Sequence, residues 1–520
     1  VAKKDFILNT NAQNINNNTG KILSEEGNVT VTAANIDSTQ GEIGGGFVTL
    51  KLTEGSNLNN NEGKVVASKD LTLQGGVAGN EKGKIVAEGA LSLNTLGQNL
   101  VNNLGSIVAQ SAVQIEAQAL HNTAGAIGSS AAGVTISSLE VDNSVTGKIV
   151  AKKDFILNTN AQNINNNTGK ILSEEGNVTV TAANIDSTQG EIVGSDVTLN
   201  LLKGSNLSNN SGEVVARNNL TLLGGVAGNE KGKIVAEGEL TLNSQEEAVN
   251  NNTGEIIANG KLNLESHALQ NNAGTIGSGG SEIIIRSHAI DSINGKIVAK
   301  NDITIDTKNH DITNNDKGKI VSEEGDIVVT AANVYNNNDK IFVTAENTDK
   351  NNSEIVGSFV TLNLTKGSSL TNNDGRVVAR NNLILHGGVA GNAKGEIVAE
   401  GTLTLKSQGN EVSNNFGKII ANGKLDLESH ALKNEEGKIG SSESDLKITS
   451  HKIDSTKGHI VAKNDITVTA TGYDVINNKG LILSEAGNFT LIGADLNNTK
   501  GKIFVTAENT DKNNSEIVGG

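Results

Sequence analysis

A glycine recurs every 20 to 23 residues along the whole 520-residue chain, and this repeat limits the folds that the chain can adopt. Variants of one unit fill the chain, with Ile at the second position after the glycine, a small residue at the fourth, then an L-x-L run and a final apolar-x-Asn step. The unit from Gly147 to Gly169 shows these steps in order. A unit this short cannot bury a core by itself, so the repeat indicates a solenoid in which neighbouring units stack.

A longer repeat lies on top of the short one. Residues 1–43 are identical to residues 150–192, so about seven units form one super-repeat. The third super-repeat is longer by a 14-residue unit, Lys340 to Ser353. Asp339 and Ser353 stand at positions where other units have glycine. With that unit included, we count about 25 units.

No linker interrupts the repeat, so we expect residues 1–520 to form a single continuous β-helical segment. The chain opens at Val1 and stops at Gly520, in both cases in the middle of a unit. We therefore also expect it to be cut from a longer protein at both ends.

Apolar residues recur at every second position within a unit, which is the period of a β-strand with one buried face. Gly, Asn, Asp, Lys and Glu separate the short runs and are typical of corners. The pattern predicts three short strands per turn, an all-β fold and a parallel β-helix of about 25 turns. In one unit the predicted core residues are Ile234, Ala236, Leu240, Leu242 and Val249.

The composition agrees with such a coil. The chain contains no Pro, Cys, Met or Trp, and its formal net charge is −16 with both signs alternating along the sequence. Proline lacks the amide hydrogen that each central strand must donate, and the absence of cysteine excludes disulfides and thiolate metal sites. The charge argues against a nucleic-acid-binding surface, which would concentrate Lys and Arg on one face.

Asparagine recurs just before the unit glycine. Stacking of the turns would let these side-chain amides hydrogen-bond from one turn to the next, as in the asparagine ladders of cross-β stacks. The same side chains can instead satisfy a bend, and the two roles are compatible. The residues expected in the ladder are Asn17, Asn60, Asn103, Asn166, Asn209, Asn251, Asn272, Asn373 and Asn415.

The pattern G-[KE]-I-x-A, L-x-L and [LI]-x-N-x-x-G, as in the unit that opens at Gly254, resembles the filamentous haemagglutinin repeat over the whole chain. That family comprises large bacterial exoproteins of two-partner secretion systems, including filamentous adhesins and the stalks of contact-dependent growth-inhibition effectors. The resemblance implies a right-handed β-helical shaft that is exported through an outer-membrane transporter and displayed at the cell surface. It also implies that receptors on host or neighbouring cells are bound through regions outside this segment.

Parallel β-helices also include polysaccharide-processing enzymes, which need clustered carboxylates and aromatic platforms. Tyr335 and Tyr473 are the only tyrosines and lie far apart in the sequence, which does not favour such a platform. The paired acids recur once per super-repeat, so we interpret them as solvated corners. These pairs are Glu25 with Glu26, Glu174 with Glu175, and Glu323 with Glu324.

Histidines occur in two pairs that we expect to stack about 5 Å apart in successive turns. Such pairs could bind a metal ion or respond to pH. Stacking without a function, at a corner position that favours small residues, is the simpler interpretation, because Gln118 and Leu139 occupy the equivalent places in the first super-repeat. The pairs are His267 with His288 and His430 with His451.

The glycine-rich stretch from Gly75 to Asn80, repeated at Gly224 and Gly387, lacks the ending of a phosphate-binding loop and is interpreted as a tight corner. We therefore expect no catalytic residue, no cofactor site and no metal ligand.

The functional prediction follows from the shape expected of a stacked β-helix. It is a stalk or filament segment that presents a distal domain of a secreted surface protein. The alternatives are a self-assembling extracellular fibre, joined head to tail through exposed strand edges, and an enzyme acting on polysaccharides.

Overall fold

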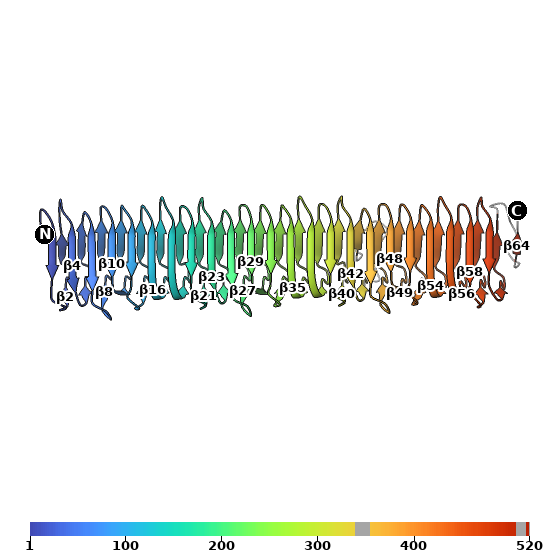
Figure 1. Ribbon diagram of the computed structural model, residues 1–520, viewed down its shortest axis with the longest axis horizontal. Coiled ribbons are helices and arrows are strands. Elements are labelled where there is room, and N and C mark those ends of the chain that lie inside the picture. The colour runs from blue at the N-terminus through green and yellow to red at the C-terminus, as the bar shows by residue number, and fades with distance from the viewer. Residues whose placement is uncertain (338–353, 506–515, 519–520) are drawn as a thin grey trace. The chain divides into compact units, whose positions relative to one another are not determined.

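The structure is a computed structural model that describes residues 1–337, 354–505 and 516–518. All regular elements in these residues are β-strands (Figure 1). No helix that could cross a membrane occurs among them. The strands belong to two compact units, each of which is described by itself: Val1–Asn250 with Gly254–Asn259, and Asn251–Thr253 with Gly260–Gly520.

A typical turn contains three strands, as the alternation of apolar residues predicts. One turn of the first unit consists of β31 (Lys233–Ala236), β32 (Leu240–Asn243) and β33 (Ala248–Asn250). Its five predicted core side chains, Ile234, Ala236, Leu240, Leu242 and Val249, are at most 1% exposed. The period of two therefore identified which side chains point into the solenoid.

The opening strands of successive turns pair in parallel and form the first sheet of each unit. In the first unit they are β3 (Lys21–Leu23), β6 (Glu42–Gly45), β9 (Lys64–Ala67), β12 (Lys84–Ala87), β15 (Ser106–Ala109), β17 (Ala126–Ser129), β19 (Lys148–Ala151), β22 (Lys170–Ser173), β25 (Glu191–Gly194), β28 (Glu213–Ala216), β31 and β34 (Glu255–Ala258). In the second unit they are β36 (Thr275–Ser278), β38 (Lys296–Ala299), β41 (Lys319–Ser322), β44 (Glu354–Gly357), β47 (Arg376–Ala379), β50 (Glu396–Ala399), β53 (Lys418–Ala421), β55 (Lys438–Ser441), β57 (His459–Ala462), β60 (Leu481–Ser484), β63 (Lys502–Phe504) and β64 (Glu516–Val518).

The second and third runs of each turn form the other sheet, with strands of four or five and of two to four residues respectively. In six turns these two runs are fused into one nine-residue strand, so the prediction of three strands is wrong there. The fused strands are β16 (Val113–His121), β18 (Val134–Asp142), β35 (Leu262–Gln270), β37 (Ile283–Asp291), β54 (Leu425–Lys433) and β56 (Leu446–Asp454).

The missing corner has a local cause. In the turn before β16, Leu96 and Gly97 adopt positive φ angles of 52° and 76° and bend the chain between the second and third runs. The fused strands are two residues shorter at this place and contain no residue with positive φ. Without a left-handed residue the chain stays in the extended region and the ladder continues.

Residues of adjacent turns pair in register, so equivalent positions of the repeat are stacked. In the first sheet Ile85 lies opposite Val65 on one side and opposite Ile107 on the other. Each aliphatic side chain therefore contacts its counterparts in the turns above and below. Each unit is a parallel β-solenoid, and the two units together contain about 23 turns, which confirms the predicted fold class.

The expected count of about 25 turns includes the 14-residue unit from Lys340 to Ser353. That whole unit falls within residues 338–353, which lie outside the described residues. Strand β41 pairs directly with β44, with Ile320 opposite Ile355.

Candidate functional site

A column of buried asparagines lies beside the glycines that open the turns. The Nδ2 of Asn80 donates to Oδ1 of Asn102 at 2.7 Å, Asn102 donates to Asn122 at 2.7 Å, and Asn122 donates to Asn143 at 2.7 Å. All four side chains are fully buried. Each Nδ2 also reaches a main-chain oxygen, for example that of Ala126 at 3.1 Å from Asn102. The predicted asparagine ladder is therefore present, and it joins the interiors of successive turns.

The structure corrects part of the predicted membership of the ladder. Asn17, Asn60, Asn166, Asn209 and Asn251 belong to the column. Four others point outward, and their Oδ1 atoms accept a main-chain N–H of the next turn. These are Asn103, Asn272, Asn373 and Asn415, and their inward neighbours Asn102, Asn271, Asn372 and Asn414 are the ladder residues. Consecutive side chains alternate between faces, so an error of one residue places the side chain on the wrong face.

The paired acids lie at the bend that follows the opening strand, as expected for solvated corners. Glu174 and Glu175 follow β22, and the Nζ of Lys152 from the preceding turn lies 3.1 and 2.7 Å from their carboxylates. Lys300 pairs in the same way with Glu323 and Glu324. The hydrogen bond from Lys152 lowers the pKa of Glu175, whereas a general acid needs a raised pKa.

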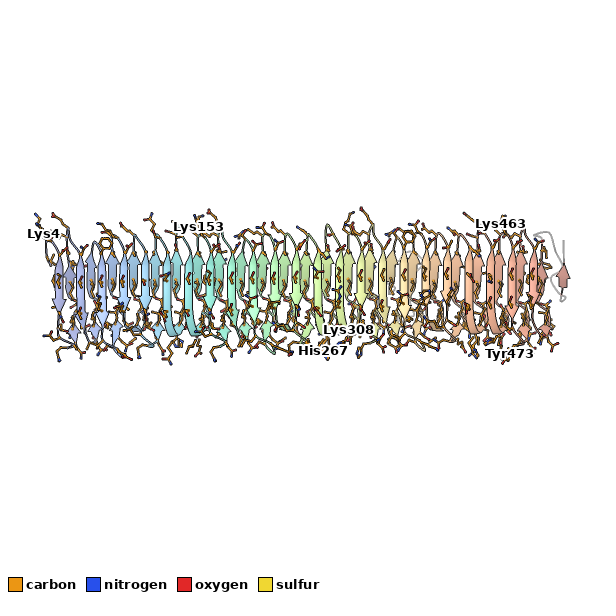
Figure 2. All side chains as sticks on the ribbon, viewed as in Figure 1. Lys4, Lys153, His267, Lys308, Lys463 and Tyr473 are labelled. Carbon is orange, nitrogen blue, oxygen red and sulfur yellow. The ribbon has the colours of Figure 1, made fainter. Side chains whose placement is uncertain are left out.

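The histidine pairs stack as predicted, but on strands rather than at a corner. His267 and His288 lie on the fused strands β35 and β37, and their ring centroids are 4.8 Å apart. His430 and His451 repeat this arrangement on β54 and β56, also at 4.8 Å. Figure 2 shows His267 at the edge of the second unit opposite to Lys463.

Each histidine pair extends into a column of three rings, which the sequence analysis did not recognise. His310 lies 5.3 Å from His288, and Tyr473 lies 5.8 Å from His451, measured between ring centroids. The spacing in the sequence could have revealed this extension. His310 and Tyr473 each stand two residues before the apolar residue that opens a short third strand, and each paired histidine stands two residues before the equivalent apolar residue of its fused strand. The remaining tyrosine, Tyr335, lies on β43 (Val334–Tyr335), outside these columns.

The two ring nitrogens within each pair face each other. The distance between the Nδ1 atoms is 2.9 Å for His267 and His288, and 2.8 Å for His430 and His451. In such a contact one Nδ1 donates and the other accepts, and the tautomers of the two rings decide which does which. Among the described residues, no group of three or more His, Cys, Asp or Glu side chains is placed to hold a metal ion.

We expect His459, at the start of β57, to titrate below the ordinary histidine pKa of 6.5. Partial burial is the larger cause, and the charge of Lys438, which lies opposite in β55, lowers the pKa further. The folded state favours the neutral ring, so the contribution of His459 to stability is complete above pH 6.5 and is lost as the pH falls through the lowered pKa. NMR titration should show an upward shift of this pKa in Lys438→Gln. An unchanged pKa in that variant would exclude the effect of Lys438.

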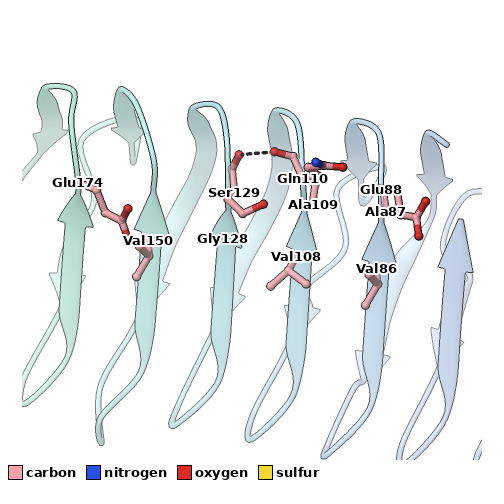
Figure 3. A pocket seen from close by; sticks show the side chains of 11 residues that line it. Val86, Ala87, Glu88, Val108, Ala109, Gln110, Gly128, Ser129, Val150 and Glu174 are labelled. Atoms are coloured by element: carbon pink, nitrogen blue, oxygen red, sulfur yellow. Dashed lines mark hydrogen bonds between the residues drawn. The ribbon is translucent and has the colours of Figure 1, made fainter. Parts of the chain in front are cut away.

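The outer face of the first sheet carries a column of aliphatic side chains that the sequence analysis did not single out. In the first unit, Val86, Val108 and Val150 project from β12, β15 and β19, and Gly128 of β17 leaves a gap between the last two (Figure 3). The gap opens into a shallow hollow of about 580 Å³ with Glu174 among its lining residues. Its walls combine aliphatic and small residues with Glu88, Gln110 and Glu174, and the Oγ of Ser129 donates to the main-chain oxygen of Ser111 at 2.6 Å.

The glycine-rich stretches form strands rather than corners, which corrects the prediction. Gly76–Gly79 is strand β11, and its pairing with β8 (Asn57–Asn59) contains a register shift between Val77 and Gly79. Only Gly75, with φ of 133°, makes the bend. A side chain there would collide with Leu52 of the preceding turn, which explains the glycine.

Comparison with known families finds one repeat along nearly the whole chain. No curated protein and no solved structure matches the chain. The haemagglutinin repeat family matches residues 8–62, 44–103, 86–167, 140–244, 235–355, 347–429, 409–493 and 470–510.

Proposed function

Because the chain belongs to the haemagglutinin repeat family, we propose that it is a structural stalk or filament segment of a secreted bacterial surface exoprotein. In this proposal the segment holds a distal functional domain, of the adhesin or contact-dependent inhibition type, away from the cell. The observation that carries the proposal is the uniformity of the turns. Equivalent aliphatic residues stack in register, as with Val65, Ile85 and Ile107, and the same asparagine column runs beside them.

In a stack of this kind, the length of the segment increases with the number of its turns. Each turn contacts only its neighbours, so turns can be added without a change in the core or in the cross-section. The axial rise is about 4.8 Å per turn. We propose that the outer-membrane transporter is the partner during export, and that each emerging turn folds against the turn before it.

We also propose that the two compact units belong to one continuous solenoid. The support comes from the sequence, because the repeat passes through their boundary without a break. Gly254, Ile256, Ala258, Leu262 and Leu264 follow the same pattern as the units on either side.

A truncation tests both proposals. Residues 150–192 repeat residues 1–43 exactly, so a chain without residues 1–149 begins with the same sequence as the full chain. It lacks about seven turns, and we expect its maximum dimension in small-angle X-ray scattering to fall by about 34 Å with an unchanged cross-sectional radius. The melting temperature should change little, because stability is shared between neighbouring turns.

The full-length chain is the matched control for this experiment. A truncated chain with the same maximum dimension, or with a larger cross-section, would contradict a continuous stalk. A chain with hinged lobes would show a scattering profile with more than one compact body.

A further inference from the structure

The asparagine ladder is interrupted by four serines, and each interruption has the same geometry. The serine Oγ accepts a hydrogen bond from the asparagine of the preceding turn, at 3.0 to 3.2 Å. All four serine side chains are fully buried. They are Ser38, Ser187, Ser292 and Ser455.

The asparagine that follows each serine has a buried Oδ1 atom without a hydrogen-bond partner in the protein. In an unbroken part of the ladder this atom accepts the Nδ2 of the preceding asparagine, as Oδ1 of Asn102 does from Asn80. After a serine no such donor reaches it. The four orphaned atoms are Oδ1 of Asn60, Asn209, Asn314 and Asn477.

The chain contains its own control for this observation. Asn143 occupies the place of Ser292 and Ser455 in the first super-repeat, and it donates to Oδ1 of Asn166 at 2.8 Å. Asn336 occupies the place of Ser38 and Ser187, and it donates to Oδ1 of Asn372 at 2.7 Å. The orphaned oxygen therefore follows the serine and not the position in the turn.

Side-chain length explains the gap. Serine ends at Oγ, so the place of the asparagine Nδ2 group is not filled by the side chain. Around Gly63, an ideal Cβ position lies closest to the main-chain oxygen of Ser38, 2.6 Å from Oδ1 of Asn60 and 3.2 Å from the main-chain oxygen of Gly41. These oxygens lie close together beside the serine. Around Gly212 the ideal Cβ position is likewise closest to the main-chain oxygen of Ser187, and it lies 2.7 Å from Oδ1 of Asn209 and 3.0 Å from the main-chain oxygen of Gly190.

We propose that each serine rung is a binding site for one buried water molecule, which replaces the missing amide group. The water accepts the hydroxyl proton of the serine, which has no other acceptor in the ladder. It donates one proton to the orphaned Oδ1 and the other to the glycine main-chain oxygen. Three hydrogen bonds are the usual number for a buried water, and unsatisfied buried polar groups are the usual reason for one.

Replacement of all four serines by asparagine tests this proposal in the full chain. The changes are Ser38→Asn, Ser187→Asn, Ser292→Asn and Ser455→Asn. We expect oxygen-17 magnetic relaxation dispersion to count four fewer long-lived waters in this variant than in the unmodified protein. Asn143→Ser is the matched control in the opposite direction, and we expect it to add one.

The single variant Ser187→Asn, with an expected loss of one water, serves if the fourfold variant does not fold. A crystal structure of the unmodified protein should show water density between Oγ of Ser187 and Oδ1 of Asn209. An unchanged count in Ser187→Asn would overturn the proposal. An anomalous signal at the serine rungs after a soak in rubidium chloride would also overturn it, because the site would then hold a cation.

Discussion

Replacement of Gly105 by alanine is expected to unfold the turn that contains it and to weaken both neighbouring turns. An ideal Cβ at this position would lie 2.6 Å from Oδ1 of Asn102 and 2.7 Å from Nδ2 of Asn80, and closer still to the main-chain oxygen of Asn80. That oxygen accepts the N–H of Gly83 at 3.0 Å, so it cannot move without loss of this bond. We expect a loss of more than about 4 kcal/mol, measured by hydrogen exchange of the amides in β12, β15 and β17.

The preceding turn supplies the control. Gly97 has φ of 76°, but no heavy atom lies within 4 Å of its ideal Cβ position. Glu246 occupies the equivalent place one super-repeat later with φ of 74°, so a residue with a side chain adopts this conformation. We expect Gly97→Ala to cost no more than about 1–2 kcal/mol. Equal effects of the two substitutions would show that Gly105 is not needed for the close approach of the turns.

The second large effect is expected from Phe155→Ala. Phe155 opens strand β20 (Phe155–Asn158), is fully buried, and lies between Val134 and Val178 of the adjacent turns. Truncation removes most of the ring and leaves a cavity that stacked turns cannot close, because their spacing is set by main-chain hydrogen bonds. We expect a loss of about 3–5 kcal/mol, measured by chemical denaturation together with hydrogen exchange in β18 and β23 (Val178–Ala182).

A conservative variant separates the cavity from the loss of an aromatic ring. Ile303 follows Asp302 as Phe155 follows Asp154, and it is equally buried. Phe155→Ile therefore introduces a residue that the chain already uses at this place, and we expect a cost below about 1.5 kcal/mol. Equal losses in the two variants would contradict the cavity explanation.

Both substitutions act on the contact between turns, which is the basis of the proposed stalk. A solenoid has no distant part of the chain to compensate for a defect, since each turn contacts only its neighbours. The serine rungs interrupt the row of asparagines locally without changing the register of the main chain. Ser187 still receives the hydrogen bond of Asn166, and β25 and β28 around it pair without a shift.

The sequence determined the solenoid because the pattern of apolar residues and glycines is local and is repeated from turn to turn. The unit length set the circumference of a turn, and the alternation of Ile, Leu and Val identified the buried face, as Ile234 and Leu240 illustrate. Stacking followed from energy, since one unit cannot bury enough apolar surface to offset its conformational entropy. The ladder and the histidine pairs followed from the same stacking.

Tertiary structure alone decided the features that depend on the direction or the reach of individual side chains. It placed Asn102 rather than Asn103 in the ladder, fused two runs into β16 and β35, and extended the histidine pairs to His310 and Tyr473. A repeat pattern specifies these only to within one residue, and one residue reverses the face of a strand. The sequence also could not predict the orphaned oxygens that follow the serines. They depend on a difference in length between serine and asparagine side chains in turns that lie about 21 residues apart in the sequence.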